Sequence, residues 1–236
     1  MKKQIPNFLT CMNLFSGCIA LVMVFRNHLD YTAYLILIAA FFDLLDGMVA
    51  RKVGSNSEFG KQIDSLADMV SFGLVPGVVM FKLLQMSALA ELVPNAMLRT
   101  FVQFVPFIIT IFSALRLAKF NLDTRQTSSF IGLPTPANTL LIVSLPLILI
   151  QRPGQFDALI LNPVFILFIS MFLSYMLISE IPLFALKFKS LDLKANIYQY
   201  ILIALAIVLI AIFSFVAIPM VVILYVLLSI VKNKLA

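Results

Sequence analysis

Residues 43–68 read DLLDGMVARKVGSNSEFGKQIDSLAD, and this stretch guides the interpretation of the rest of the chain. A turn-forming segment, KVGSNSEF, separates two runs in which acidic and small residues recur every three or four positions, the spacing of one helical face. A short connection makes antiparallel neighbours of two helices, so the two polar faces can meet. The stretch therefore predicts a helical hairpin that gathers four carboxylates near one end, those of Asp43, Asp46, Asp64 and Asp68.

Small residues and one guanidinium group accompany the acids. Gly47, Ala50 and Arg51 follow on the first face, and Gly60 opens the second. Because these small residues remove side-chain bulk beside the carboxylates, a ligand can approach the backbone there.

The negative charge of four converging carboxylates has to be neutralised. Two of them about 4 Å apart repel by roughly 4 kcal/mol at an effective dielectric near 20, so either some are protonated or cations neutralise them. All-carboxylate ligation suits the hard ions Mg²⁺ and Mn²⁺, with Ca²⁺ as a further option, and two such ions would balance four charges. The structural alternative is a solvated hairpin in which Arg51, Lys52 and Lys61 pair with the acids.

The composition indicates a membrane protein. Of 236 residues, 62% are hydrophobic and 12% charged, whereas a soluble domain is about half apolar and about a quarter charged. The apolar runs are continuous and many approach the roughly 20 residues that cross a bilayer as a helix. The sequence predicts an all-α polytopic membrane protein with about eight transmembrane helices, near residues 8–25, 31–51, 61–88, 96–120, 134–150, 160–187, 197–213 and 215–231. We expect one transmembrane domain over 1–236, with a catalytic six-helix core (1–187) and two additional C-terminal helices (188–236).

The distribution of positive charge predicts the orientation. A net charge of +6 does not indicate nucleic-acid binding in a membrane protein, where the question is which side carries Lys and Arg. An even number of helices places both termini on one side, together with thirteen of the 17 Lys and Arg residues. We therefore expect a multi-pass protein of the cell membrane whose termini and aspartates face the cytoplasm.

The hairpin also resembles a known family. The pattern Asp43-x2-Asp46-Gly47-x2-Ala50-Arg51-x8-Gly60-x3-Asp64-x3-Asp68 is similar, in all eight fixed positions, to the signature of the CDP-alcohol phosphatidyltransferases. The resemblance implies a homodimeric membrane enzyme that displaces CMP from a CDP-linked substrate with an alcohol.

The resemblance also implies a role for each residue of the pattern. Asp43, Asp46 and Asp64 would be ligands in a two-metal site. Asp68 would touch metal as well, and would be the catalytic base that activates the acceptor hydroxyl. The cytidine diphosphate site would be lined by Gly47, Ala50, Arg51 and Gly60.

Further stretches look like the phosphatidylserine synthase branch of that family. They are IPNFLT (5–10), SFG (71–73), RLAKFN (116–121) and FIGLPTPA (130–137). This branch implies CDP-diacylglycerol and L-serine as substrates. One departure is Lys119, where the family pattern has arginine more often. Lysine keeps the positive charge but cannot form the bidentate hydrogen bonds of a guanidinium group.

The candidate serine site lies near the end of the fourth helix. Arg116, Lys119 and Arg125 can bind the serine carboxylate, and Asn121 can add a polar contact. For each basic residue the alternative is anchoring at the membrane surface or contact with lipid headgroups.

Three other polar residues each have two possible roles. Asn7 and Thr10 share a helix face, so they can contact CDP-diacylglycerol or cap a helix. Glu180 is an intramembrane acid for which we expect a salt bridge with Lys187 or Lys189 rather than catalysis.

Three other functions remain open at this stage. The first is the same transfer to another acceptor, such as glycerol 3-phosphate, an inositol phosphate or choline. The second is a divalent-cation transporter, disfavoured because its acids would lie near the bilayer midplane. The third is a non-catalytic scaffold, disfavoured by the cost of holding four acids together.

Overall fold

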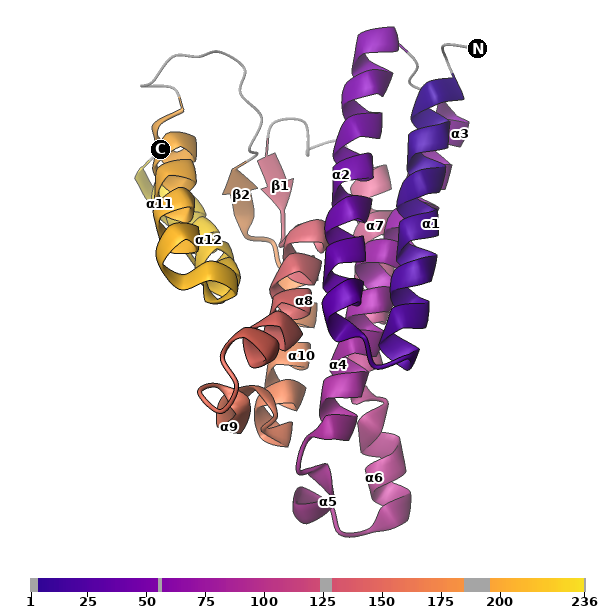
Figure 1. Cartoon of the computed structure of the whole chain (residues 1–236). Coiled ribbons are helices and arrows are strands. Elements are labelled where there is room, and N and C mark those ends of the chain that lie inside the picture. The colour runs from indigo at the N-terminus through magenta and orange to yellow at the C-terminus, as the bar shows by residue number, and fades with distance from the viewer. Residues whose placement is uncertain (1–3, 55–56, 124–128, 185–195, 236) are drawn as a thin grey trace.

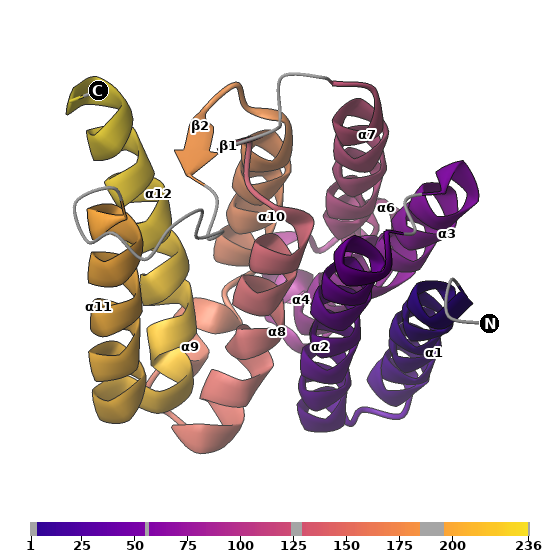
Figure 2. The ribbon, with the colours of Figure 1, turned by 90° about the horizontal axis from the view of Figure 1, so that it is seen from above.

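The structure is a computed structural model that describes residues 4–54, 57–123, 129–184 and 196–235. Long helices stand side by side, and the hairpin of α11 and α12 packs at the far side from α1 (Figures 1 and 2). The elements are α1 (Ile5–Phe25), α2 (Leu29–Val53), α3 (Glu58–Asp68), η2 (Met69–Leu74), α4 (Val75–Met86), α5 (Leu89–Leu92), α6 (Ala96–Gln103), η3 (Val105–Phe107), α7 (Ile108–Leu122), β1 (Ser129–Ile131), α8 (Thr135–Gln151), α9 (Asp157–Ile160), α10 (Pro163–Ile178), β2 (Pro182–Phe184), α11 (Ile197–Phe213), η4 (Ser214–Val216) and α12 (Ala217–Leu235).

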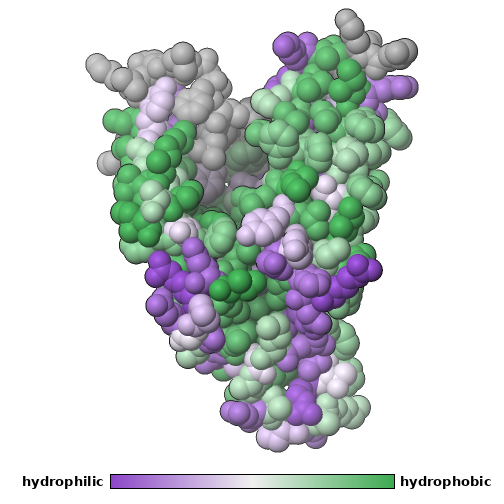
Figure 3. Space-filling model, viewed as in Figure 1, coloured by the Kyte–Doolittle hydropathy of each residue, from purple (hydrophilic) through white to green (hydrophobic). Residues whose placement is uncertain are grey.

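Apolar helices of membrane-spanning length dominate the molecule. In the described part of the chain, five helical runs are long and apolar enough to cross a bilayer: Ile5–Phe25, Leu29–Val53, Glu58–Met86, Ala96–Leu122 and Ile197–Lys234. Apolar side chains cover much of the surface of α1, α2, α11 and α12, while hydrophilic groups gather toward the helix ends (Figure 3). The predicted all-α polytopic membrane protein is therefore confirmed, and the number of eight crossings stays a prediction.

The last long apolar run is bent into a hairpin. Ser214 has a φ of 52°, a left-handed conformation that ends α11, and Pro219 lies in the first turn of α12, where the missing proline N–H costs nothing. The predicted break between residues 213 and 215 is confirmed.

The predicted helix over 160–187 is too long. The helix α10 ends at Ile178, and Ser179 already has an extended backbone with a ψ of 145°. Pro182 explains why the helix does not continue, because proline has no N–H to donate to the carbonyl of Ile178, four residues earlier, and its ring would clash with that carbonyl. The chain then forms β2, which pairs antiparallel with β1 to make a two-stranded ribbon.

The segment just after Asp68 is a π-helical turn, η2, that other helices hold in place. The Ser71 hydroxyl donates to the Asn13 carbonyl oxygen (3.1 Å), while Thr139 Oγ1 donates to the carbonyl of Phe72 (2.9 Å) and Thr110 Oγ1 to that of Gly73 (3.0 Å). A π turn weakens the regular backbone ladder, and single π turns recur at functional sites. Here hydroxyl groups on α7 and α8 satisfy two of its carbonyls, which fixes the position of Asp68 at its start.

Close packing of α1 on η2 requires a glycine. A Cβ atom at Gly17 would overlap the Ser71 side chain and lie 3.1 Å from the Ser71 Cα. We expect Gly17→Ala to destabilise the fold by about 1–3 kcal/mol, or roughly 2 to 12 °C in Tm, because a packed interior accommodates an extra carbon only by shifting. Thermal unfolding in detergent measures this. The neighbouring exposed residue provides the control, since Cys18→Ala should leave Tm unchanged, and an equal Tm for Gly17→Ala would contradict the packing argument.

Candidate active site

Three of the four predicted acids converge in the structure. One carboxylate oxygen from each of Asp43, Asp64 and Asp68 lies within 4.8 Å of the others. Asp46 is 6% exposed and accepts a hydrogen bond of 2.6 Å from Thr10 Oγ1, which joins α2 to α1. The two helical faces predicted from the sequence therefore do bring their acids together.

The helices that carry these acids are not packed neighbours, which corrects the predicted hairpin. The helix α1 packs against both α2 and α3, whereas α2 and α3 meet chiefly where the carboxylates converge. The reason is chemical, because faces made of aspartates and small residues offer little apolar surface to bury. A cavity lies between them instead.

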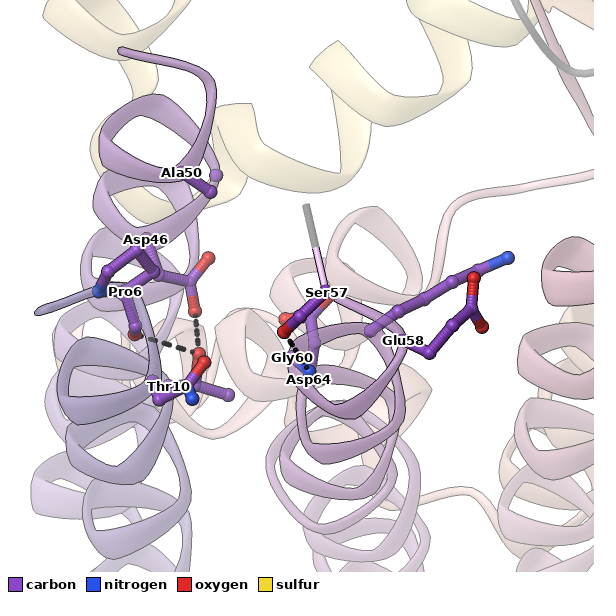
Figure 4. A pocket seen from close by; sticks show the side chains of 11 residues that line it. Pro6, Thr10, Asp46, Ala50, Ser57, Glu58, Gly60 and Asp64 are labelled. Carbon is purple, nitrogen blue, oxygen red and sulfur yellow. Dashed lines mark hydrogen bonds between the residues drawn. The ribbon is translucent and has the colours of Figure 1, made fainter. Parts of the chain in front are cut away.

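This cavity has a volume of about 360 Å³ and opens beside the acids. Asp46 and Thr10 lie on one wall, and Ser57, Gly60 and Asp64 lie on the opposite wall (Figure 4). Ser57 Oγ accepts a hydrogen bond of 3.0 Å from the Gly60 backbone N–H and so caps the first turn of α3. The cap fixes where α3 begins, and hence where its acids point.

The basic residues of the hairpin do not pair with the acids. Within the described residues, none of Arg51, Lys52 and Lys61 forms an ion pair with the four aspartates, so the structural alternative is not supported. Asp64 Oδ1 is buried without a hydrogen-bond partner among those residues. An unpaired buried carboxylate oxygen is costly, so this oxygen is available to a positively charged ligand.

The same donor set fits divalent cations. Oxygen-only ligands that include several carboxylates are what Mg²⁺ and Mn²⁺ prefer. Asp43, Asp64 and Asp68 can share one ion directly, and Asp46 lies on the adjoining cavity wall.

A comparison with known families matches this site. The profile of the CDP-alcohol phosphatidyltransferase family matches residues 3–231. The chain belongs to this family. Membership in a phosphatidyltransferase family favours group transfer over the transporter and scaffold hypotheses.

Individual relatives narrow the comparison. The chain is 35% identical over 139 residues to the CDP-diacylglycerol–serine O-phosphatidyltransferase of Methanocaldococcus jannaschii. The matched region covers 59% of this chain and 58% of that protein. It is 34% identical over 142 residues to the archaetidylserine synthase of Methanothermobacter thermautotrophicus, covering 59% and 56%. It is 28% identical over 184 residues to the CDP-diacylglycerol–serine O-phosphatidyltransferase of Bacillus subtilis, covering 75% and 88%. The match thus spans little more than half the length of the two archaeal relatives.

The residues expected to line a nucleotide site lie mostly on the cavity. Asn7, Thr10, Gly47, Ala50 and Gly60 all line it. A Cβ atom at Gly60 would lie 3.2 Å from Asn7 Oδ1, so a larger residue would narrow the space between α1 and α3.

Arg51 differs from the other residues of the signature. It is exposed and does not line the cavity. Its Nη1 atom would be 3.5 Å from a Cβ atom at Gly47, so the guanidinium group lies beside the cavity wall.

The residues predicted to bind serine do not form one cluster. Arg116 is 7% exposed, donates from Nη1 to Thr135 Oγ1 (3.2 Å) and interacts electrostatically with Asp68. Asn121 instead joins α7 to α3, because its Nδ2 donates to Ser65 Oγ (2.7 Å). Arg125 lies outside the described residues.

Lys119 has a different partner from the one we expected for a serine ligand. It forms an ion pair with Glu180, the acid for which we predicted Lys187 or Lys189 as partner. Lys187 and Lys189 lie outside the described residues. A contact between α7 and the segment after α10 is long-range in sequence, so no local spacing predicts it.

Two residues at this site were not predicted from the sequence. Asn13 donates from Nδ2 to Asp68 Oδ1 (3.1 Å), and Lys61 lines the cavity while its Nζ donates to the Asn121 carbonyl oxygen (2.8 Å). A signal for Asn13 was present, because it continues the three-residue spacing of Asn7 and Thr10 along the same face of α1.

Proposed function

We propose that this chain is a CDP-diacylglycerol–serine O-phosphatidyltransferase, which transfers the phosphatidyl group to the serine hydroxyl and releases CMP. The observation that carries the proposal is the buried guanidinium group of Arg116, which donates to Thr135 and whose Nε has no partner among the described residues. A buried N–H donor on a permanent cation suits a carboxylate, which serine has and choline lacks. The Methanocaldococcus jannaschii and Bacillus subtilis relatives, both CDP-diacylglycerol–serine O-phosphatidyltransferases, agree with this acceptor.

A phosphorylated acceptor fits the site less well. Such an acceptor would need several free basic groups, but Lys119 pairs with Glu180 and Lys61 is bound to the carbonyl oxygen of Asn121. In the described part of the chain, Arg116 is therefore the basic group best placed beside Asp68.

The positions of the side chains support the following reaction. The serine Oγ attacks the phosphorus on the lipid side of the diphosphate, and its proton passes to a carboxylate oxygen of Asp68. The new Oγ–P bond gives phosphatidylserine as the P–O bond to CMP breaks, and the electron pair leaves with CMP. Asn13 holds Asp68 Oδ1 by a hydrogen bond, which leaves Oδ2 for the proton.

The acids would hold two divalent cations, Mg²⁺ or Mn²⁺, with Asp43, Asp46, Asp64 and Asp68 as ligands. Bound there, the cations would neutralise the charge of the diphosphate. Asn7, Thr10, Gly47, Ala50 and Gly60 would receive the cytidine diphosphate in the cavity, and Arg51 at its edge would reach a phosphate oxygen.

The proposal extends to the setting of the enzyme. The beginning of α1 and the end of α12 lie toward the same end of the molecule as α3 (Figure 1), which agrees with termini and active site on the cytoplasmic side of the cell membrane. We propose a homodimer on the family resemblance, with the site carried by residues 1–187 of each chain.

An assay with an acceptor panel tests the function. Purified protein with Mn²⁺ and CDP-diacylglycerol should release CMP when serine is added, and much less with glycerol 3-phosphate, inositol phosphate or choline. If serine caused no CMP release but another alcohol did, that alcohol and not serine would be the acceptor.

The two basic residues of α7 should respond differently to neutralisation. We expect Arg116→Gln to raise the KM for serine by roughly 10- to 100-fold, because a charge-assisted hydrogen bond to the substrate carboxylate is lost. Lys119→Gln is the matched control, since its half-exposed ion pair with Glu180 should contribute little, and its KM should change by less than about threefold. Steady-state kinetics at saturating CDP-diacylglycerol measure both, and a larger effect for Lys119→Gln would reverse the assignment.

A further inference from the structure

Asn13 has a polar atom that the mechanism above does not use. The residue lies on α1 and is fully buried, with 0% of its surface exposed. Its Nδ2 must face Asp68, because an ionised carboxylate only accepts hydrogen bonds. Its Oδ1 is then left buried without a hydrogen-bond partner among the described residues. This oxygen is an acceptor next to the base that has room for one donor.

A second buried amide lies on α8, the helix that packs against Arg116 and η2. Asn138 is also 0% exposed, and both its Oδ1 and its Nδ2 lack a partner within the described ranges. It follows Thr135 by one turn of α8, and so shares the helix face on which Thr135 binds Arg116 and Thr139 binds the Phe72 carbonyl. Its amide therefore faces the same region as Arg116 and η2.

Unsatisfied buried amides are rare in proteins because each one costs free energy. Here two amides and the Arg116 Nε are unsatisfied; Asn13 donates to Asp68, while Arg116 is held by Thr135 on the α8 face that also binds η2 just after Asp68. Their chemistry is also complementary to one kind of molecule: Arg116 and Asn138 Nδ2 offer donors, while Asn13 Oδ1 offers an acceptor. A small zwitterion presents the opposite set, a carboxylate and an ammonium group.

We propose that Asn13 and Asn138 determine specificity for an amino-acid acceptor, with Asn13 Oδ1 accepting from the ammonium group and Asn138 Nδ2 donating to the carboxylate beside Arg116. This proposal rests on the proposed function, because it names the groups that recognise the acceptor of that same site. Asn13 then has two roles, since its Nδ2 donates to the base Asp68 and its Oδ1 accepts a hydrogen bond from the ammonium group of the substrate. An alcohol without an ammonium group would leave Oδ1 unpaired and bind more weakly.

Paired ligands separate these roles. The test compares the KM for serine with the inhibition constant of 3-hydroxypropanoate, which is serine without its ammonium group. We expect Asn13→Ala to raise the serine KM by roughly 10- to 100-fold, while the inhibition constant of 3-hydroxypropanoate changes by less than about threefold. Ser16→Ala is the matched control, because Ser16 is a buried residue on the same helix whose hydroxyl donates only to the Met12 carbonyl within α1, and it should change neither constant.

The second amide gives an independent test should Asn13→Ala fail to fold. Serinol is serine with its carboxylate replaced by a hydroxymethyl group. We expect Asn138→Ala to raise the serine KM at least about tenfold and to leave the inhibition constant of serinol nearly unchanged. Ser144→Ala, also fully buried on α8 and bonded to the Leu141 carbonyl of its own helix, is the control.

The outcomes distinguish this proposal from the proposed function. If Asn13→Ala weakens serine and 3-hydroxypropanoate equally, or lowers only kcat, then Asn13 acts through Asp68 alone and the ammonium site is wrong. If it weakens Mn²⁺ binding without changing the preference for serine, Asn13 Oδ1 is a metal ligand and the proposal is again overturned. If the wild-type protein shows no serine-dependent CMP release at all, the proposed function itself fails.

Discussion

Asp68→Asn is expected to lower serine-dependent CMP release by roughly 10²- to 10⁴-fold while the protein folds normally. The rate falls because a carboxamide cannot take the proton of the attacking hydroxyl, and a positioned general base contributes about this factor. The fold survives because asparagine has the same shape, and its Oδ1 can still accept the hydrogen bond that Asn13 donates to Asp68. Initial rates under saturating substrates measure the loss, and Tm in detergent checks the fold.

The control for this substitution is an aspartate on α2 far from the site. Asp30 lies in the first turn of that helix, at the opposite end from Asp43 and Asp46. Asp30→Asn should retain most of the activity. If Asp68→Asn kept more than about a tenth of the wild-type rate, another group would have to be the base.

Removal of divalent cations is expected to abolish CMP release, and Mn²⁺ or Mg²⁺ should restore it. Asp64→Ala should weaken Mn²⁺ binding at least about tenfold, because even groups that only orient metal ligands contribute that much. Electron paramagnetic resonance of free Mn²⁺ measures the binding directly, without reference to catalysis. Glu58→Gln is the matched control, since Glu58 lines the cavity on the same helix but does not belong to the converging acids.

The difference in Tm between Asp64→Ala and the wild type should have opposite signs in EDTA and in Mn²⁺. In EDTA, Asp64→Ala should raise Tm above that of the wild type, because it removes one of several mutually repelling carboxylates. With Mn²⁺ present the order should reverse, because cation binding stabilises the wild-type protein more. A lower Tm in EDTA would mean that Asp64 is needed for packing and would argue against a site built to hold cations.

The parts of the site that were predictable follow from local spacing. Four aspartates at three- and four-residue intervals predicted a common cluster, and three of them converge within 4.8 Å. Gly47, Ala50 and Gly60 were expected beside them and line the cavity. Helix periodicity carries this information because it depends only on neighbours one turn away.

The features that were missed depend on contacts between distant segments. The pairing of Lys119 with Glu180 joins residues 61 positions apart, and the ribbon of β1 and β2 joins segments on either side of α8 and α10. Likewise, the packing of α1 against both α2 and α3 joins segments that no pattern within the hairpin connects. Burial of the unpartnered amides of Asn13 and Asn138 is a property of the assembled bundle as well.

The π turn between Asp68 and Val75 sets the rotation of α3 relative to α4. Each residue advances an α-helix by about 100° and a π turn by less, so the same six residues in regular α-helical form would rotate α3 relative to α4. Every signature residue would still be present in the sequence and correctly spaced. Yet Asp64 and Asp68 would face away from Asp43, and the hydroxyls of Thr110 and Thr139 would lose their carbonyl partners. The direction in which Asp64 and Asp68 point therefore depends on six uncharged residues that follow the signature in the sequence.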